Sequence, residues 1–474
     1  MRIDHLPSTR QPFNSNVSKI YTQEVSMGSI KQGETSPTPK RRVALTTMLL
    51  ALAFSLSYMD RQILPLLLEP IKHAFSLTDS EIGMLQGLAF GAFYACSGIV
   101  LGVLVDRFHR VGIAAACVAF WGLATAACGL AGNFIQLFVA RTSTAVGEAG
   151  CSPASYSVLS DMLSGRALLR ATAVYNVGPY VGGGMALILG SMALHYFTTV
   201  GGMDVPLFGH LEPWQSVFLV LGLPGLLLAA FILALQEPKR HESGQEIDTS
   251  TRATLQFIFS SPMLLFYFAA FVFSTSGLFV LLTWFPSLMI REGFGTASTV
   301  GRPLGAIFLA VGLCGCVASQ LLLRKLENRD LLSSLLRRMS AMWAVQIPLA
   351  VAFIFVDTAS LAYWFYASQV IIFSVVTTFM VAPIQLAVPN RMRGRATGVF
   401  MTFNYMLGAS IGPWSVGMLS DRMKGNPHGL LTAFVMVLGV SATGAAISIY
   451  LSSTQKTRMN PVDSLPQQTV SGNI

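Results

Sequence analysis

Twelve apolar stretches, each roughly 20 residues or longer, follow one another along the chain, and this pattern restricts the possible folds most strongly. Because an apolar run of that length crosses a bilayer as a helix, we expect an all-α integral membrane protein. The first stretch contains FSLSYMDRQILPLLL, residues 54–68, in which Asp60 and Arg61 are adjacent. A charge at mid-membrane costs about 2.5–3.5 kcal/mol on insertion scales, so these two residues are the first candidates for function.

Composition supports this class of protein. Hydrophobic residues make up 53% of the chain and charged residues 11%, whereas soluble domains contain about 25% charged residues. The formal net charge is +9, but the basic residues form short clusters between apolar runs, so no nucleic-acid partner is expected. The six cysteines lie in apolar segments without a C-x-x-C pair or a nearby histidine set, and neither a disulfide nor a metal site is predicted.

The polar segments divide the chain into five parts. The longest polar stretch inside the series of apolar runs, QEPKRHESGQEIDTSTRATLQ, separates six runs from six. We predict a disordered cytoplasmic tail over residues 1–42, a six-helix bundle over 43–236, a cytoplasmic linker over 237–261, a second six-helix bundle over 262–452, and a C-terminal tail over 453–474. The expected spans are 43–68, 82–105, 111–131, 134–160, 171–197, 214–236, 262–290, 303–323, 334–356, 360–388, 396–419 and 429–452.

Loop charges predict the orientation. If the N-terminus is cytoplasmic, inner loops carry roughly four times as many Lys and Arg residues as outer loops, which is a strong positive-inside bias. Both termini are therefore expected in the cytoplasm, with the protein in a bacterial inner (plasma) membrane and acting as a monomer. The polar N-terminal residues also lack the apolar core of a signal peptide.

The loop between the second and third spans carries the first family motif. GVLVDRFHR, from Gly102 to Arg110, resembles the G-x-L-x-D-R-x-x-R loop of the major facilitator superfamily. Gly102 would let two helices approach closely, Asp106 could face the positive end of a neighbouring helix, and Arg107 and Arg110 would tie the loop. We predict a conformational latch here; the alternative is a set of ordinary inner-loop charges.

A second motif lies in the fourth span. ARTSTAVGEAGCSPASYSVLSD is similar to the R-x-x-x-x-x-G-E-A element of the same superfamily, and SYMDRQIL, WFPSLMIREGFG and GASIGPWSVGMLSD extend the resemblance to its spinster-like branch. The resemblance implies a transporter with two pseudo-symmetric six-helix bundles and export of lysophospholipid-like or sphingoid lipids. Two positions depart from the superfamily pattern: Leu323 replaces an expected aspartate, and Gln215 an expected arginine.

The fifth span contains GPYVGG, which is similar to the core of a motif found in proton-coupled exporters. Gly178, Gly182 and Gly183 would permit close helix packing, and Pro179 would bend the helix. Simple glycine-rich packing without a role in antiport explains the pattern equally well.

Four charged residues within the spans define the predicted site. At 1.5 Å per residue, Asp60 in the first helix and Arg141 in the fourth reach the same depth, while Arg141 and Glu148 share one helix face. We expect Asp60, Arg61, Arg141 and Glu148 to form a buried network that is neutral as a set, because burying any one alone is too costly. Glu148 is favoured as the proton carrier, and a purely structural network is the alternative.

The second half has almost no charge in its spans but many aromatic residues, from which we hypothesise an apolar wall of a cavity. Its aromatic residues are Phe266, Tyr267, Phe271, Phe273, Trp284, Phe285, Tyr363, Trp364, Phe365, Phe373 and Phe379. A charged half opposite an aromatic half suits an amphipathic substrate.

The sequence therefore predicts a secondary transporter of an amphipathic or lysolipid-like molecule, working by alternating access and coupled to protons. A symporter of a small organic anion is the alternative within this class; a membrane enzyme and a transport-inactive receptor are alternatives outside it. His73 and Asp79 have the wrong spacing for an acyltransferase pair and no nucleophile partner, so no enzyme activity is expected. No nucleotide-binding motif and no cofactor are predicted.

Overall fold

A computed structural model describes residues 40–206, 208–240, 251–324, 331–389 and 392–455. The predicted tails, 1–42 and 453–474, fall almost wholly outside these residues, as does the middle of the linker. Contacts divide the chain into Met1–Ala44, of which only the start of the first helix is described, and Leu45–Ile474, which holds all other described residues.

The first half of the chain forms long helices with one small hairpin. Its elements are α2 (Lys40–Phe75), α3 (Asp79–Gln86), α4 (Leu88–Arg107), α5 (Arg110–Cys128), α6 (Phe134–Met162), α7 (Gly165–Val200), β1 (Met203–Val205), β2 (Gly209–Leu211), α8 (Pro213–Gly222) and α9 (Pro224–Leu233). The antiparallel pair β1–β2 is a hairpin that the sequence did not predict.

The second half contains helices and no strand among its described residues. Its elements are α10 (Thr251–Phe259), α11 (Pro262–Arg291), α12 (Ala297–Arg324), α13 (Leu331–Ala352), η2 (Phe353–Phe355), α14 (Ala359–Thr378), α15 (Ala382–Ala387), α16 (Arg393–Phe403), the π-helical turn η4 (Asn404–Ala409), α17 (Ser410–Arg422) and α18 (Gly429–Thr454). The short helix α10 lies in the predicted linker.

Local sequence explains where several helices begin and end. Thr78 starts α3 with a capping box, because its hydroxyl accepts from the Glu81 backbone N–H while the Glu81 carboxylate accepts from the Thr78 N–H. Asn133 caps α6 through its side-chain oxygen, which accepts from the Gln136 N–H at 2.9 Å. Gly201 ends α7 with a φ of 84°, a conformation that favours glycine.

The twelve predicted spans all correspond to helices or helix runs. Among the described residues, ten helices are long and apolar enough to cross a membrane. The other two are α6, which carries Arg141 and Glu148, and the run α16–η4–α17, which a π-helical turn interrupts. The first span was predicted too short: α2 continues past Pro65 and Pro70 to Phe75, because prolines in membrane helices bend rather than end them.

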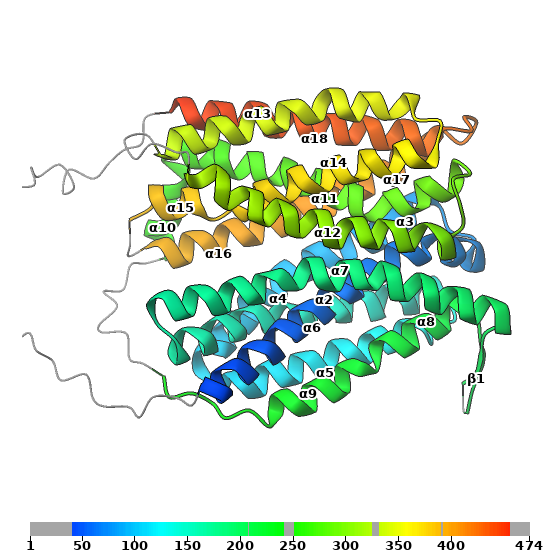
Figure 1. Ribbon diagram of the computed structural model, residues 1–474, viewed down its shortest axis with the longest axis horizontal. Coiled ribbons are helices and arrows are strands. Elements are labelled where there is room, and N and C mark those ends of the chain that lie inside the picture. The colour runs from blue at the N-terminus through cyan, green and yellow to red at the C-terminus, as the bar shows by residue number, and fades with distance from the viewer. Residues whose placement is uncertain (1–39, 207, 241–250, 325–330, 390–391, 456–474) are drawn as a thin grey trace, which may run out of the picture. The chain divides into compact units, whose positions relative to one another are not determined.

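The helices form two bundles (Figure 1). Helices α2 to α9 make one group and α11 to α18 the other, with α7 and α12 running side by side between them. We call these groups the N-terminal and C-terminal bundles. Their boundaries at 43–236 and 262–452 stay a prediction.

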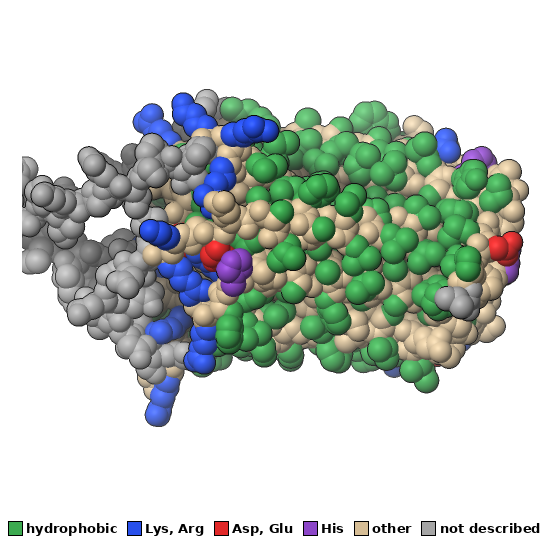
Figure 2. All heavy atoms as spheres, turned by 90° about the horizontal axis from the view of Figure 1, so that it is seen from below, with side chains coloured by type: hydrophobic (Ala, Val, Ile, Leu, Met, Phe, Trp, Pro, Cys, Tyr) green, Lys and Arg blue, Asp and Glu red, His purple; other side chains and the backbone are tan. Residues whose placement is uncertain are grey.

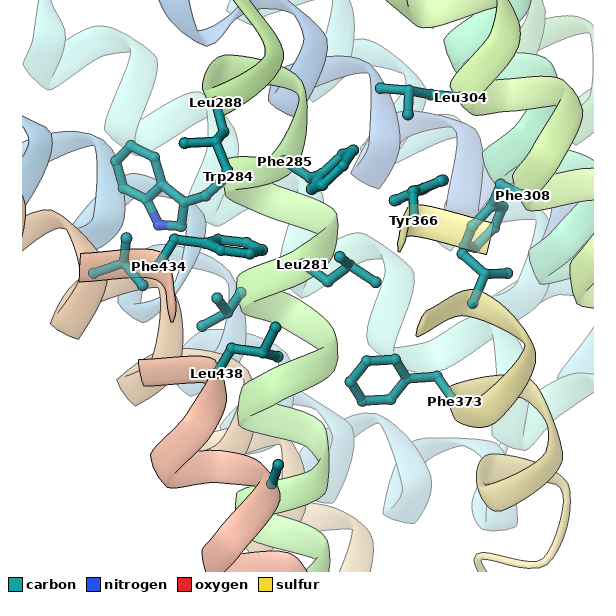
Figure 3. Close-up of a cluster of buried hydrophobic side chains, with 14 of the residues drawn as sticks. Leu281, Trp284, Phe285, Leu288, Leu304, Phe308, Tyr366, Phe373, Phe434 and Leu438 are labelled. Carbon is teal, nitrogen blue, oxygen red and sulfur yellow. The ribbon is translucent and has the colours of Figure 1, made fainter. Parts of the chain in front are cut away.

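Most of the aromatic residues named for the second half pack inside the C-terminal bundle, whereas Trp364 is exposed. Figure 3 shows Trp284 and Phe285 on α11 between Phe434 and Leu438 on one side and Tyr366 and Phe373 on the other. Trp284 and Phe285 are fully buried, and the Phe285 ring lies 4.9 Å from the Tyr366 ring. The hypothesis that such residues form a cavity wall is therefore wrong for these side chains, because a bundle with few charges buries its aromatic residues against one another.

The two ends of the helices differ in charge. We call the end where α4 finishes and α13 begins the linker end, and the opposite end, which carries β1 and β2, the hairpin end (Figure 1). Figure 2 shows Lys and Arg side chains gathered at the linker end and a broad hydrophobic band between the two ends. This distribution matches the basic bias that the loops predicted.

Glycines bring α7 close to its neighbours on two faces. A Cβ on Gly182 would lie 1.8 Å from the Ser55 carbonyl oxygen of α2, so no other residue fits there. On the second face, a Cβ on Gly184 would lie 2.8 Å from the Gly305 carbonyl oxygen, and one on Gly305 would lie 2.4 Å from the Gly184 carbonyl oxygen. The bundles therefore meet backbone to backbone along a seam between α7 and α12.

Candidate functional site

An ion pair between α2 and α6 lies at the centre of the candidate site. Arg61 Nε donates to Glu148 Oε2 at 2.6 Å, and Ser57 Oγ donates to the same oxygen at 2.7 Å. Glu148 is 1% exposed and Arg61 is 7% exposed. Pro65 follows Arg61 by one helical turn and Pro153 follows Glu148 closely, so both partners lie where a proline interrupts the backbone hydrogen bonds.

Aromatic rings surround the guanidinium of Arg61. Its Cζ lies 4.8 Å from the ring centroid of Tyr58, 4.7 Å from that of Phe90 and 4.8 Å from that of Tyr94. Such contacts stabilise a desolvated cation by about 2 kcal/mol or more. Arg61 thus keeps favourable electrostatic contacts even if Glu148 loses its charge.

The second arginine is bound differently. Arg141 Nη1 lies 3.3 Å from both the Asp60 carbonyl oxygen and Thr144 Oγ1, and its Cζ lies 4.7 Å from the Phe90 ring centroid. Among the described residues, Arg141 Nε and Glu148 Oε1 have no hydrogen-bond partner although both atoms are buried.

The structure therefore brings all four predicted charges together but pairs only two of them. Asp60 is 2% exposed and joins through its backbone carbonyl, rather than by the carboxylate contact that we expected. The depth predicted for Asp60 and Arg141 agrees with this contact. Buried polar atoms without a partner are costly, so Arg141 Nε and Glu148 Oε1 are the two least satisfied positions of these charged side chains among the described residues.

A second set of charges joins the two bundles at the hairpin end; we call it the hairpin-end cluster. Arg291 of α11 donates to Asp79 through Nη1 at 2.8 Å and Nη2 at 2.7 Å, and to Glu69 Oε1 through Nε at 2.9 Å. Lys72 Nζ lies 2.5 Å from Asp79 Oδ1, and Ser420 Oγ donates to Asp79 Oδ2 at 2.6 Å. Asp79 is thus bound by groups from both bundles.

Asp421 extends the hairpin-end cluster to the start of α3. Its carboxylate accepts from the backbone N–H of Asp79 at 3.2 Å and of Ser80 at 2.8 Å. A carboxylate at a helix N-terminus satisfies free N–H groups and interacts favourably with the helix dipole. Two contacts of the cluster cross the bundle boundary: the bidentate Arg291–Asp79 pair and the Asp421 carboxylate at the start of α3. They hold the hairpin end closed.

The predicted latch loop is open in this structure. Asp106 and Arg107 are exposed, and nothing lies within 4 Å of the position that a Cβ on Gly102 would take. The close helix approach predicted at Gly102 is therefore not made here, because the face of α4 that carries Gly102 meets no neighbour, although Leu101 packs near Gly150 of α6. Arg240 of the linker instead donates to the carbonyl oxygens of Val105 at 2.8 Å and Phe108 at 2.6 Å.

Arg110 is the member of the predicted latch that is fully engaged. It is buried, and its guanidinium donates to Glu237 at 2.6 Å, to the Ser157 hydroxyl at 3.0 Å and to Asp161. Burial opposes ionisation of Glu237, but the backbone N–H of Val111 and the Arg110 guanidinium outweigh it and lower the pKa of Glu237. Arg110 thus ties the start of α5 to the linker.

Sequence reasoning missed several residues of both regions. The rings around Arg61 gave no distinct signal, since aromatic residues are common in membrane helices. Glu69 and Asp79 fell outside the expected spans, which ended the first helix at residue 68. A signal for the cluster did exist: Lys72 and Arg291 are two of the few basic residues assigned to outer loops.

Comparisons with known proteins agree with the fold and identify the family. The sequence profile of the Major Facilitator Superfamily matches residues 50–413. An MFS-type efflux pump of Mycolicibacterium smegmatis is 27% identical over 416 residues, which covers 88% of this chain and 90% of the pump. Protein spinster homolog 1 of Xenopus laevis is 25% identical over 424 residues, covering 83% of this chain and 76% of that protein.

A solved structure has the same fold. The crystal structure of a bacterial homologue of the human lysosomal transporter spinster, inward-facing and unoccupied, matches with a TM-score of 0.74 at 23% identity and covers 88% of this chain and 98% of its own. With spanning helices in two bundles and a match to the family over residues 50–413, the chain is a multi-pass membrane transporter that belongs to the Major Facilitator Superfamily.

Proposed function

We propose that this protein is a proton-coupled secondary transporter that moves an amphipathic, lysolipid-like molecule by alternating access. The buried pair of Arg61 and Glu148, surrounded by aromatic rings, carries this proposal. Charges at mid-membrane persist where they serve a substrate or ion pathway. No catalytic role is proposed for any of these residues.

The pair provides a mechanism for coupling. When Glu148 binds a proton, Arg61 loses its anionic partner at 2.6 Å but remains in contact with three rings. The freed guanidinium then binds an anionic group of the substrate, and release of the proton restores the pair and expels that group. The substrate's apolar part lies against Tyr94, Tyr405 and Phe279, which are only partly buried.

The hairpin-end cluster and the open latch loop support alternating access. In this structure, Arg291 and Asp79 hold the hairpin end together, while Asp106 is exposed at the linker end. The positive-inside bias assigns the linker end to the cytoplasm, so we infer an inward-facing state with both termini cytoplasmic in a bacterial inner membrane, and a monomeric transporter.

Arg141 favours a second candidate, a proton-linked symporter of a small organic anion. Its Nε has no hydrogen-bond partner among the described residues, and it lies beside the first site. Two arginines within one site suit a compact carboxylate. Uptake of lysophosphatidylethanolamine and of benzoate into the same proteoliposomes would separate the two candidates.

Glu148→Gln tests proton coupling. The amide keeps the shape of a protonated carboxyl but cannot release a proton, so we expect accumulation driven by a pH gradient to stop while downhill counterflow of the same substrate continues. The pH dependence of substrate binding should also flatten. The measurement is side-by-side gradient-driven and counterflow transport in proteoliposomes.

Asp204→Asn is the matched control, because Asp204 is an exposed acid in the β1–β2 hairpin and pairs only with His210 among the described residues. It should leave both transport modes unchanged. Undiminished gradient-driven accumulation by Glu148→Gln would move the coupling role to Asp60 or remove proton coupling altogether.

A further inference from the structure

A π-helical turn lies in the C-terminal bundle opposite the Arg61 site. Residues Asn404–Ala409 form this turn, η4, and join α16 to α17 in one continuous helix run. A π turn holds one more residue than the α-helix around it, is rare, and frequently marks a functional site. None of the residues Asn404–Ala409 was among the predicted site residues.

One side of the turn is fixed to its own bundle. Asn404 Oδ1 accepts a hydrogen bond from Thr275 Oγ1 of α11 at 2.8 Å, and both side chains are buried. A Cβ on Gly408 would lie 2.9 Å from both Thr275 Cβ and the Val272 carbonyl oxygen. The start and the end of the turn are therefore held against α11.

The other side of the turn contacts the N-terminal bundle. The ring of Tyr405 lies 4.9 Å from the ring of Tyr94 on α4. A Cβ on Gly91 would lie 2.8 Å from the Tyr405 carbonyl oxygen and 2.4 Å from Ser410 Oγ, so the two backbones are in close contact. Tyr405 thus reaches across the bundle boundary at the depth of the site.

The ring of Tyr94 links Tyr405 to the Arg61 guanidinium. Its centroid lies 4.9 Å from that of the Tyr405 ring and 4.8 Å from Arg61 Cζ. A movement of Arg61 toward Tyr405 would therefore displace Tyr94. Each helix packed around the Arg61–Glu148 pair also contributes charged or titratable groups. These are Tyr58 and Asp60 of α2, Tyr94 of α4, Cys128 of α5, Arg141 and Cys151 of α6, and Tyr405 of η4.

The same helix run ends at the hairpin-end cluster. Ser420 and Asp421 lie 15 and 16 residues beyond Tyr405, roughly 24 Å along a helix, and bind Asp79 and Ser80. A Cβ on Gly417 would lie 2.1 Å from the Asp79 carbonyl oxygen, so α17 also packs tightly on α3. The run therefore connects the Arg61 site with the contacts that close the hairpin end.

We propose that Tyr405 is a positioning residue that transmits the charge state of the Arg61–Glu148 pair to the hairpin end through the π-helical turn and α17. The turn is the element with two arrangements: conversion of η4 to α-helix shifts the register of α17 by one residue and withdraws Ser420 and Asp421 from α3. This inference rests on the proposed function, because it takes Glu148 as the group whose charge changes.

Distances across the hairpin end test the inference without any substrate. Spin labels at Ala74→Cys and Arg422→Cys, in a chain whose six native cysteines are replaced, report on opening by double electron–electron resonance in nanodiscs. Glu148→Gln should shift the distance distribution toward the open hairpin end. In Tyr405→Leu that shift should fall at least fivefold, whereas Tyr405→Phe, which keeps the ring, should retain it.

Two further variants complete the test. Tyr450→Leu removes a tyrosine from the exposed face of α18 and should leave the Glu148→Gln shift unchanged. Tyr94→Leu breaks the same ring contact from the other bundle and should abolish the shift, which keeps the inference testable if Tyr405→Leu does not fold. A full shift in both Tyr405→Leu and Tyr94→Leu overturns the role of Tyr405. No shift from Glu148→Gln in the native Tyr405 chain overturns the proton-coupling proposal, and the Tyr405 role with it.

Discussion

The Arg61 site and the hairpin-end cluster are both built on arginine and carboxylate, yet they differ in which helices they join. Arg61 and Glu148 belong to one bundle and are almost completely buried. Arg291 and Asp79 come from different bundles, and the Arg291 side chain is 23% exposed. A pair within one bundle can change its charge without separating helices, whereas a pair across two bundles must break whenever that end opens. The first arrangement suits a change of charge, and the second suits gating.

The largest expected effect comes from leaving one charge of the buried pair alone. Arg61→Ala leaves the buried Glu148 without its cationic partner and should lower the free energy of unfolding by about 3–5 kcal/mol. It should also abolish transport. The double variant Arg61→Leu with Glu148→Leu removes both charges and should recover expression and thermal stability but not transport. Thermal unfolding in detergent and proteoliposome transport measure the two properties separately. Equal stability of the single and double variants would show that the pair is not desolvated.

An intermediate effect is expected at the hairpin end. Arg291→Gln removes three charge-assisted hydrogen bonds between bundles, so it should favour the open hairpin end by about 2 kcal/mol, which is roughly thirtyfold. Fold stability should fall much less than in Arg61→Ala. Labelling of Ala74→Cys with a membrane-impermeant maleimide would report the change. If Arg291→Gln labels no faster than the parent, the cluster does not act as a gate.

The smallest effect on stability is expected in the latch loop. Asp106 is exposed in this state, so Asp106→Asn should change the free energy of unfolding by no more than about 0.5 kcal/mol. Turnover should nevertheless slow, because the loop is needed when the linker end closes. Substrate affinity should stay nearly unchanged. A large loss of binding together with normal conformational exchange would contradict the latch role.

Sequence patterns predicted the fold well, because hydropathy and loop charge act over long segments. All twelve spans appear, and the ends of the helices fit the expected loops except where α2 continues through Pro65 and Pro70. The hairpin β1–β2 and the π-helical turn at Asn404 were not predicted, since elements this short and irregular show no hydrophobic periodicity. These features depend on contacts with residues distant in sequence.

Prediction of the site was less complete. The charges themselves were identifiable, because Asp60, Arg61, Arg141 and Glu148 interrupt apolar helices. Their pairing was not, because charge and helix periodicity do not distinguish the Asp60 carboxylate from the Asp60 backbone carbonyl, which Arg141 contacts. The aromatic residues of the second half did not reveal their place in the fold, because residue type alone does not distinguish a bundle core from a cavity wall.

The seam between α7 and α12 has a thermodynamic consequence for the whole cycle. Where Gly184 and Gly305 bring the two backbones together, neither residue has a side chain that could change rotamer or exchange apolar area with lipid. This backbone contact should therefore contribute almost nothing to the heat capacity of conformational exchange. We expect the temperature dependence of the cycle to originate at the two ends of the molecule, where charged groups gain and lose water.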